Sequence, residues 1–234
     1  MTANASWIDV PTTGGKCQAY LSLPPTGTGP GILLIQEIFG VNTHIRAVAD
    51  QYAQDGYVVL APDLFWRQKP RIELGYAADD MTQGVAMMSQ ADIPQTIADL
   101  SDAAKALRAR PETTGSRIAG IGYCFGGRLT YLLAAAGAID VAIPYYGGGI
   151  QNETDKAAAI GVPMLMHFGE KDSMIPQSAV QEIKDSLAGK CNVDIHVYPD
   201  ADHGFNCWAR GSYHQRSAAL AHGRSLQFLA SHLG

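Results

Sequence analysis

The chain has 234 residues, of which 47% are hydrophobic and 17% charged, a composition typical of a globular protein. Its formal net charge is -5 at pH 7 and it has no basic cluster, which argues against nucleic acid as a partner. The first residues do not have the basic and apolar regions of a signal peptide. The longest apolar stretch, at 131–139, is too short to span a bilayer, so no membrane association is expected.

The cysteines are scattered at positions 17, 124, 191 and 207, without CxxC spacing. This pattern disfavours a disulfide framework or a zinc site and favours a reducing, cytoplasmic compartment. The chain shows no internal repeat and no convincing linker. We therefore expect one domain over residues 1–234.

Short β-rich runs alternate with helical ones along the chain. Residues 6–10 and 16–23 are predicted to pair as antiparallel strands joined by the turn TTGG. The apolar run GILLI at 31–35 is typical of a central strand covered on both faces. A helix is expected over 43–54, ending before Gly56. The later elements are strands at 57–62, 117–123, 141–146, 163–169 and 194–199, and helices near 93–108, 127–136, 178–187 and 214–231.

This alternation predicts the α/β class, with a mainly parallel central sheet and helices on both faces. Functional sites in such sheets form at the carboxyl ends of the strands. The segment 66–92 has only weak periodicity. We interpret it as an excursion over the strand edge, either part of a lid or structural padding.

The stretch RIAGIGYCFGGRL, residues 117–129, begins like a buried strand and ends like a helix. Cys124 stands at the turn between them, two residues after Gly122 and two before Gly126. This spacing matches the G-x-nucleophile-x-G elbow of the α/β-hydrolase fold, with cysteine in place of serine. The helix start behind the turn favours a thiolate. A small buried hydrophobe and a dinucleotide-binding turn are the alternatives, but the third glycine comes one residue late for the latter.

Candidate partners for the thiol follow in the order acid, then histidine, which is typical of this fold. Asp172, or alternatively Glu170, follows the predicted strand 163–169, and His203 follows the strand 194–199. The remaining candidates lie in the middle of a strand or in the last helix: His196, His214, His222 and His232. The conjunction predicts a triad of Cys124, His203 and Asp172, in which the acid fixes the histidine tautomer.

Two backbone amides are expected to form an oxyanion hole. One belongs to Phe125, the residue after the nucleophile, and the other to Ile38, in the loop after GILLI. Glu37 would then lie at the mouth of the site, close to Cys124. An ordinary surface carboxylate is the alternative, but a glutamate at a strand end beside a thiol is more suggestive, because its charge would influence thiolate formation.

These residues resemble the dienelactone hydrolases, a branch of the α/β hydrolases with a cysteine nucleophile. The matching stretches are QEIFG at 36–40, APDL at 61–64, GYCFGG at 122–127, GEKDSMIP at 169–176 and DADHGF at 200–205. The resemblance implies a Cys-His-Asp triad of Cys124, His203 and Asp172 with oxyanion donors at Ile38 and Phe125. It also implies that Glu37 restrains the thiol until substrate arrives. Neither a cofactor nor a metal is implied.

The resemblance weakens where family members bind the substrate carboxylate with arginines. One such arginine follows the histidine by four residues, and here that position is Cys207. Trp208 comes next and Arg210 lies three residues after Cys207, so we expect a more apolar pocket rim. Tyr146, Cys207, Trp208 and Arg210 are the candidate substrate-binding residues.

The sequence therefore predicts a hydrolase that opens a small ester or lactone through a thioester acyl-enzyme. A thioesterase or a broad carboxylesterase is the first alternative. A non-catalytic binding protein and a thiol redox enzyme that uses Cys124 with Cys207 are two others. The expected partner is a small molecule, and the oligomeric state, monomer or weak dimer, is left open.

Overall fold

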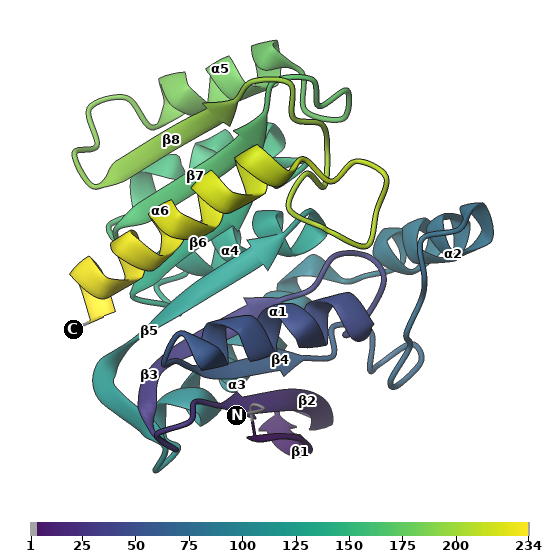
Figure 1. Ribbon diagram of the computed structural model, residues 1–234, viewed down its shortest axis with the longest axis vertical. Coiled ribbons are helices and arrows are strands. Elements are labelled where there is room, and N and C mark those ends of the chain that lie inside the picture. Colours follow the sequence, from purple (N-terminus) through teal and green to yellow (C-terminus); the bar gives the residue numbers. More distant parts are fainter. Residues whose placement is uncertain (1–3, 234) are drawn as a thin grey trace. The chain divides into compact units, whose positions relative to one another are not determined.

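Helices and strands alternate along residues 4–233, the part of the chain that the computed structural model describes (Figure 1). The chain divides into two units, Met1–Ala119 and Gly120–Gly234. Strand β5 (Thr113–Tyr123) begins in the first unit and ends in the second. The interpretation of residues 1–234 as one domain stays a prediction.

The strands of the first unit follow the order β1-β2-β4-β3. β1 (Asn4–Thr12) and β2 (Gly15–Leu23) form the expected antiparallel pair. β4 (Val58–Pro62) is antiparallel to β2 and parallel to β3 (Gly29–Ile35). The apolar runs of β3 and β4 are buried because helices cover both faces, as their sequence predicted.

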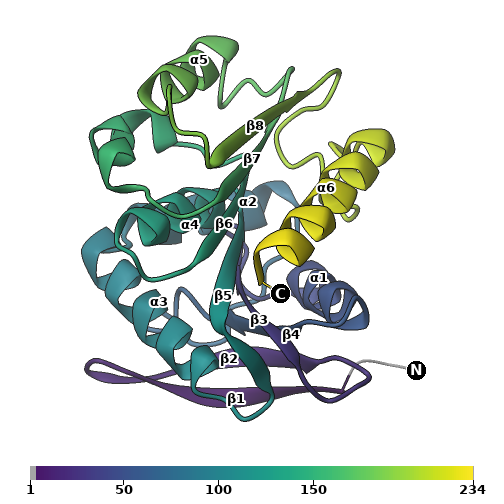
Figure 2. The same cartoon turned by 90° about the vertical axis from the view of Figure 1, so that its left-hand side faces the viewer.

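Two helices cover opposite faces of these strands (Figure 2). They are α1 (Thr43–Gln54) and α3 (Ile93–Arg108), and both have the bounds predicted from the sequence. Each begins after a side-chain cap: Asn42 Oδ1 accepts from the Ile45 amide at 3.1 Å, and Asp92 accepts from a first-turn amide of α3.

The sequence did not predict α2 (Ala78–Ser89), which lies within the excursion 66–92. Only Gly84 and Met87 of this helix are buried. A helix with so narrow a buried face carries no apolar stripe, and its periodicity is therefore weak.

The second unit carries parallel strands in the order β6-β7-β8. They are β6 (Val141–Tyr145), β7 (Met164–Gly169) and β8 (Val193–Tyr198). Helices α4 (Phe125–Ala135) and α6 (Gln215–Leu233) cover opposite faces of β6 (Figure 2). This confirms the predicted α/β class with a mainly parallel sheet and helices on both faces.

Two further helical segments lie in the second unit. Helix α5 (Gln177–Ser186) was expected, whereas the 3₁₀ segment η1 (Ile150–Ala159) was not. The backbone of Glu153 departs from helical geometry inside η1 and interrupts it. Such an interruption leaves no regular 3.6-residue pattern for the sequence to display.

Candidate active site

Cys124 forms a sharp turn between β5 and α4. Its φ of 54° lies in the left-handed region, which is strained for a residue with a side chain. The Cys124 amide donates to the Tyr145 carbonyl at 3.0 Å and so anchors the turn to the end of β6. A β-carbon on Gly122 would lie 2.1 Å from the Gly126 carbonyl, so only glycine fits there. The strained strand-to-helix elbow predicted from the sequence is therefore confirmed.

His203 and Asp172 meet within the second unit. His203 Nδ1 lies 2.8 Å from Asp172 Oδ2, and the two residues are only 7% and 2% exposed. The other carboxylate oxygen of Asp172 accepts from the Met174 and Ile175 amides, at 2.9 and 3.0 Å. These bonds fix the carboxylate, and the carboxylate in turn fixes the orientation of the imidazole.

The loops that carry these two side chains are bonded to each other. Beyond the ends of β7 and β8, the Glu170 amide donates to the Tyr198 carbonyl and the Lys171 amide to the Ala201 carbonyl, both at 2.9 Å. Glu170 itself is exposed, and its side chain accepts from the Asp200 amide at 3.2 Å. The alternative acid from the sequence is therefore exposed and bonded to the Asp200 amide, whereas Asp172 is buried against the histidine.

The His203 imidazole is poised to carry a positive charge. Burial by itself would lower its pKa, but the negative charge of Cys124 and the Asp172 carboxylate outweigh burial and raise the pKa to about 10. Among the described residues, the buried Nε2 has no hydrogen-bond partner of standard geometry. Because Nδ1 bonds Asp172, Nε2 is the ring nitrogen that is available to exchange a proton.

Tyr146 packs against this imidazole. The rings of Tyr146 and His203 meet edge to face with centroids 5.2 Å apart, and the Phe205 ring meets Tyr146 in the same way at 5.4 Å. Tyr146 has a φ of 35° and follows the last residue of β6, rather than ending the strand as expected. Its amide donates to the His167 carbonyl at 2.7 Å, which holds the strained turn.

A buried polar network that the sequence analysis missed lies next to this turn. His167 Nδ1 lies 2.8 Å from the Tyr198 hydroxyl, and its Nε2 lies 3.1 Å from Ser225 Oγ. Ser225 also bonds the Tyr145 hydroxyl at 2.7 Å. Burial, followed by the neighbouring positive charges, lowers the pKa of His167 well below its usual value. A histidine within the apolar run of β7 was the available signal.

The candidate substrate-binding residues after His203 differ in exposure. Cys207 is fully buried, whereas Trp208 is 44% exposed. The guanidinium of Arg210 packs over Gly204, and a β-carbon at Gly204 would lie 2.7 Å from it. Arg210 is therefore engaged within its own loop, and Cys207 does not lie on an exposed rim.

The loop that carries the predicted oxyanion donor follows β3 in the first unit. Ile38 is 5% exposed and Glu37 only 1%, so Glu37 is not an ordinary surface carboxylate. The roles of Ile38, Glu37 and Phe125 toward Cys124 stay predictions. Phe125 is the first residue of α4, where backbone N–H groups point out of the helix end.

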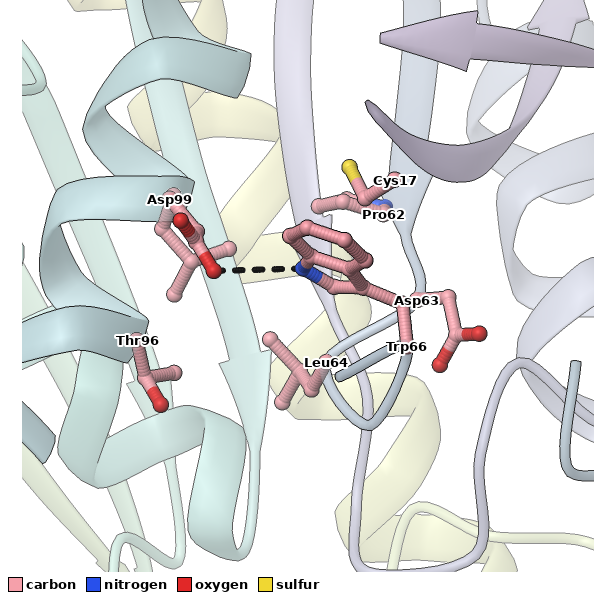
Figure 3. Close-up of a pocket in the computed structure, with 8 residues that line it drawn as sticks. Cys17, Pro62, Asp63, Leu64, Trp66, Thr96 and Asp99 are labelled. Carbon is pink, nitrogen blue, oxygen red and sulfur yellow. Dashed lines mark hydrogen bonds between the residues drawn. The ribbon is translucent and has the colours of Figure 1, made fainter. Parts of the chain in front are cut away.

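A separate pocket in the first unit lies beside Cys17 and Trp66 (Figure 3). Trp66 Nε1 donates to Asp99 Oδ2 at 3.1 Å. Burial, followed by the charges of Asp99 and Asp63, raises the pKa of Cys17 to about 12. This thiol therefore stays protonated at neutral pH and is a poor nucleophile.

Residues 4–233 contain no group of three His, Cys, Asp or Glu side chains arranged to hold a metal ion. Over the same described range, no helix combines the length and apolar character needed to cross a membrane.

A strained elbow followed by a buried acid and a histidine, each beyond a parallel strand, is the architecture of the α/β hydrolases. The comparison with protein families makes this assignment narrower. The model of the dienelactone hydrolase family matches residues 17–233, and the chain belongs to this family. The protein is accordingly a dienelactone hydrolase-like enzyme, a hydrolase of the carboxylic ester class.

Relatives resemble the chain over nearly its whole length. The carboxymethylenebutenolidase 1 of Cupriavidus pinatubonensis is 33% identical over 219 residues, which cover 93% of each protein. The carboxymethylenebutenolidase of Pseudomonas putida is 33% identical over 213 residues, 91% of this chain and 90% of the relative. The crystal structure of a Klebsiella pneumoniae protein assigned as a dienelactone hydrolase has a TM-score of 0.87 and 33% identity, and the match covers 99% of this chain and 100% of that one.

Proposed function

We propose that this chain hydrolyses a small ester or lactone through Cys124, His203 and Asp172. The observation that carries the proposal is the buried His203–Asp172 pair at 2.8 Å, whose second imidazole nitrogen interacts with the charge of Cys124. An imidazole oriented by a carboxylate and coupled to a thiol is the arrangement that activates a cysteine nucleophile.

In the first half-reaction, the Cys124 thiolate attacks the carbonyl carbon of the substrate. The carbonyl oxygen becomes an oxyanion, which accepts hydrogen bonds from the Ile38 and Phe125 amides. The tetrahedral intermediate collapses, the C–O bond to the alcohol breaks, and the His203 imidazolium gives its proton to the departing alkoxide. The products of this step are a thioester at Cys124 and a neutral imidazole.

In the second half-reaction, neutral His203 removes a proton from water, and the resulting hydroxide attacks the thioester. Collapse of the second intermediate releases the carboxylic acid and restores the thiolate–imidazolium pair. The sum is one ester and one water converted into one acid and one alcohol, or one ring-opened hydroxy acid from a lactone. Asp172 stabilises the imidazolium and stays ionised throughout.

Glu37 acts on the resting thiol in this proposal. Its carboxylate, which we place beside Cys124, opposes the thiolate that His203 favours, so the thiolate–imidazolium pair of the resting site forms less readily until substrate arrives. The 1% exposure of Glu37 supports this role, because a buried charge is only weakly screened by water.

The substrate we propose is a small ester or lactone with an apolar group near the scissile bond. Met174 and Trp208 are 62% and 44% exposed and lie on the loops that follow Asp172 and His203. Cys207, at the position where family members carry an arginine, is buried and uncharged. These features favour uncharged aryl esters or lactones at least as much as a carboxylate-bearing dienelactone.

The test is to trap the acyl-enzyme. The wild-type protein is mixed with p-nitrophenyl acetate and quenched in acid, and the intact mass and the tryptic peptides are measured. We expect a mass increase of one acetyl group on the peptide that contains Cys124, and release of that group by neutral hydroxylamine.

Cys124→Ala provides the blank for this experiment and for a panel of aryl esters, lactones and thioesters. We expect it to release no nitrophenol above the buffer rate. Full turnover in this variant, or an acetyl group on another residue, would contradict the proposal. A strong preference for thioesters over oxygen esters would instead identify the thioesterase alternative.

A further inference from the structure

The peptide group between Glu37 and Ile38 is held by a neighbouring side chain within the first unit. Gln36 Nε2 donates to the Glu37 carbonyl oxygen at 3.2 Å. That carbonyl and the Ile38 N–H belong to one planar trans peptide group, so the direction of one fixes the direction of the other. The Gln36 amide therefore sets where the Ile38 N–H points.

Gln36 is itself fixed at its other end. Its Oε1 accepts from the Leu64 amide at 3.3 Å, and the residue is fully buried. Rotation of the side-chain amide would break both bonds and leave polar groups buried without partners, which is costly. The side chain thus connects the loop after β3 to the segment after β4 in a single orientation.

The carbonyl and side chain of Ile38, on the other side of its α-carbon from this peptide, face α2. A β-carbon on Gly84 would lie 2.8 Å from the Ile38 carbonyl oxygen and 3.0 Å from Ile38 Cγ1. The backbone of α2 therefore rests directly on Ile38. Apart from Gly84, only Met87 of this helix is buried, so the contact with Ile38 is a main point of attachment for α2.

The chain that leads into α2 runs along the same loop. The Leu74 amide donates to the Phe39 carbonyl at 2.9 Å, and Asn42 Nδ2 donates to the Leu74 carbonyl at 2.9 Å. The ring of Tyr76 packs edge to face on Phe39 with centroids 4.8 Å apart. The excursion 66–92 is thus bonded to residues that directly follow Ile38.

From these contacts we infer that Gln36 and Gly84 are positioning residues for the Ile38 amide. The excursion 66–92, whose purpose the sequence left open, holds one oxyanion donor in place through α2. This inference rests on the proposed function, because it assigns a task to the amide that the mechanism uses. Gln36 acts on the reaction only through the Glu37–Ile38 peptide, and Gly84 only through the carbonyl and side chain of Ile38.

The test compares two reactions of Cys124 in the Gly84→Ala variant. Ester hydrolysis passes through an oxyanion, whereas alkylation by iodoacetamide is a displacement at saturated carbon that forms none. We expect kcat for p-nitrophenyl acetate to fall about tenfold or more, as part of the roughly 10²–10³-fold effect of one oxyanion donor. The alkylation rate of Cys124 and the KM for the ester should stay within about twofold of wild type.

Gly223→Ala is the matched control. Gly223 also lies inside a helix, α6, but a β-carbon there would meet no atom within 4 Å. Alanine has a higher helix propensity than glycine, so the substitution itself favours the helix in both variants. Only the new β-carbon at position 84 contacts Ile38. We expect Gly223→Ala to keep wild-type kcat and alkylation.

Gln36→Met is the second variant, since it keeps the length of the side chain and removes the bond to the Glu37 carbonyl. In this variant too, kcat for the ester should fall while the alkylation rate of Cys124 stays at the wild-type value. Wild-type kcat in both variants would overturn the inference, as would a parallel loss of turnover and alkylation in both. A separate result, ester hydrolysis by Cys124→Ala, would contradict the proposed function itself.

Discussion

Asp172 bonds His203 Nδ1 at 2.8 Å from a buried position, whereas Glu170, two residues earlier, is exposed and accepts from the Asp200 amide. This contrast predicts that Asp172, and not Glu170, is needed for catalysis. Asp172→Asn should lower kcat by orders of magnitude, because the members of a triad act as a unit. Glu170→Gln should keep kcat within about threefold of wild type, since an exposed carboxylate interacts only weakly with other charges. Steady-state hydrolysis of an aryl ester measures both, and a severe Glu170→Gln with a mild Asp172→Asn would contradict the assignment.

The pKa of His203 should depend on Cys124. Its rise to about 10 depends largely on the negative charge of the sulfur, acting against the opposing effect of burial. Without that charge the imidazolium is less favoured, so the titration midpoint of His203 should fall by about one to three pH units in Cys124→Ala. The His203 ring signals in NMR spectra recorded between pH 5 and 11 measure it. Equal midpoints in the two proteins would show that the sulfur does not hold the proton on His203.

Cys124 should be alkylated before the other cysteines. Cys191 is exposed but has no helix start behind it, Cys207 is buried, and Cys17 keeps its proton because its pKa is raised to about 12. Limiting iodoacetamide at pH 7, followed by peptide mass spectrometry, should find the label first on Cys124, with loss of activity in proportion. Cys191→Ser is the control and should lose neither activity nor labelling at 124. First labelling elsewhere, with activity kept, would remove Cys124 as the nucleophile.

His167 should make the fold sensitive to acid. Its pKa in the folded chain lies below the usual 6.5, so below pH 6.5 the unfolded chain binds a proton that the folded chain does not. The free energy of unfolding should therefore fall as the pH drops below about 6.5. In His167→Gln, which does not titrate, the decrease between pH 6.5 and 5 should be smaller, as urea unfolding at each pH would show. Gln227→Ala, at an exposed non-titrating position on α6, is the control and should keep the wild-type slope.

Substitution of Trp208 should change the enzyme's preference for charged or uncharged substrates more than substitution of Arg210. Arg210 packs over Gly204, whereas Trp208 is 44% exposed on the same loop. The wild type should use an uncharged aryl ester at least as well as a carboxylate-bearing lactone. Trp208→Arg should shift the ratio of kcat/KM values toward the anion by about tenfold, since a charge-assisted hydrogen bond is worth roughly 1.5–3 kcal/mol. If the wild type prefers the anion and Arg210→Gln removes this preference, Arg210 binds the carboxylate.

Much of the fold could be predicted from the sequence because its helices and strands bury regular apolar patterns. The bounds of α1 and α3 followed from caps and apolar spacing, and β3 followed from an uninterrupted apolar run. The elbow could be predicted because Gly122 and Gly126 flank the nucleophile, and the close approach of strand and helix leaves no room for a β-carbon at Gly122. Local chemistry sufficed in each of these cases.

The parts that were missed depend on contacts distant in the sequence. Helix α2 is attached through Gly84 to Ile38, 46 residues earlier, and no apolar pattern in the sequence indicates such a contact. The buried His167 was overlooked because its partner, Ser225, is 58 residues away. The burial of Cys207 likewise depends on the turn around it, which the composition of the loop does not reveal.

The pairing of β7 with β8 continues into the loops that carry Asp172 and His203. Thermal motion of one loop therefore carries the other with it, and the acid and the base are displaced together. Cys124 is tied instead to the end of β6, through the Tyr145 carbonyl. Sulfur and imidazole are thus held by different strands, and their separation, on which proton transfer depends, is set by the pairing of β6 with β7.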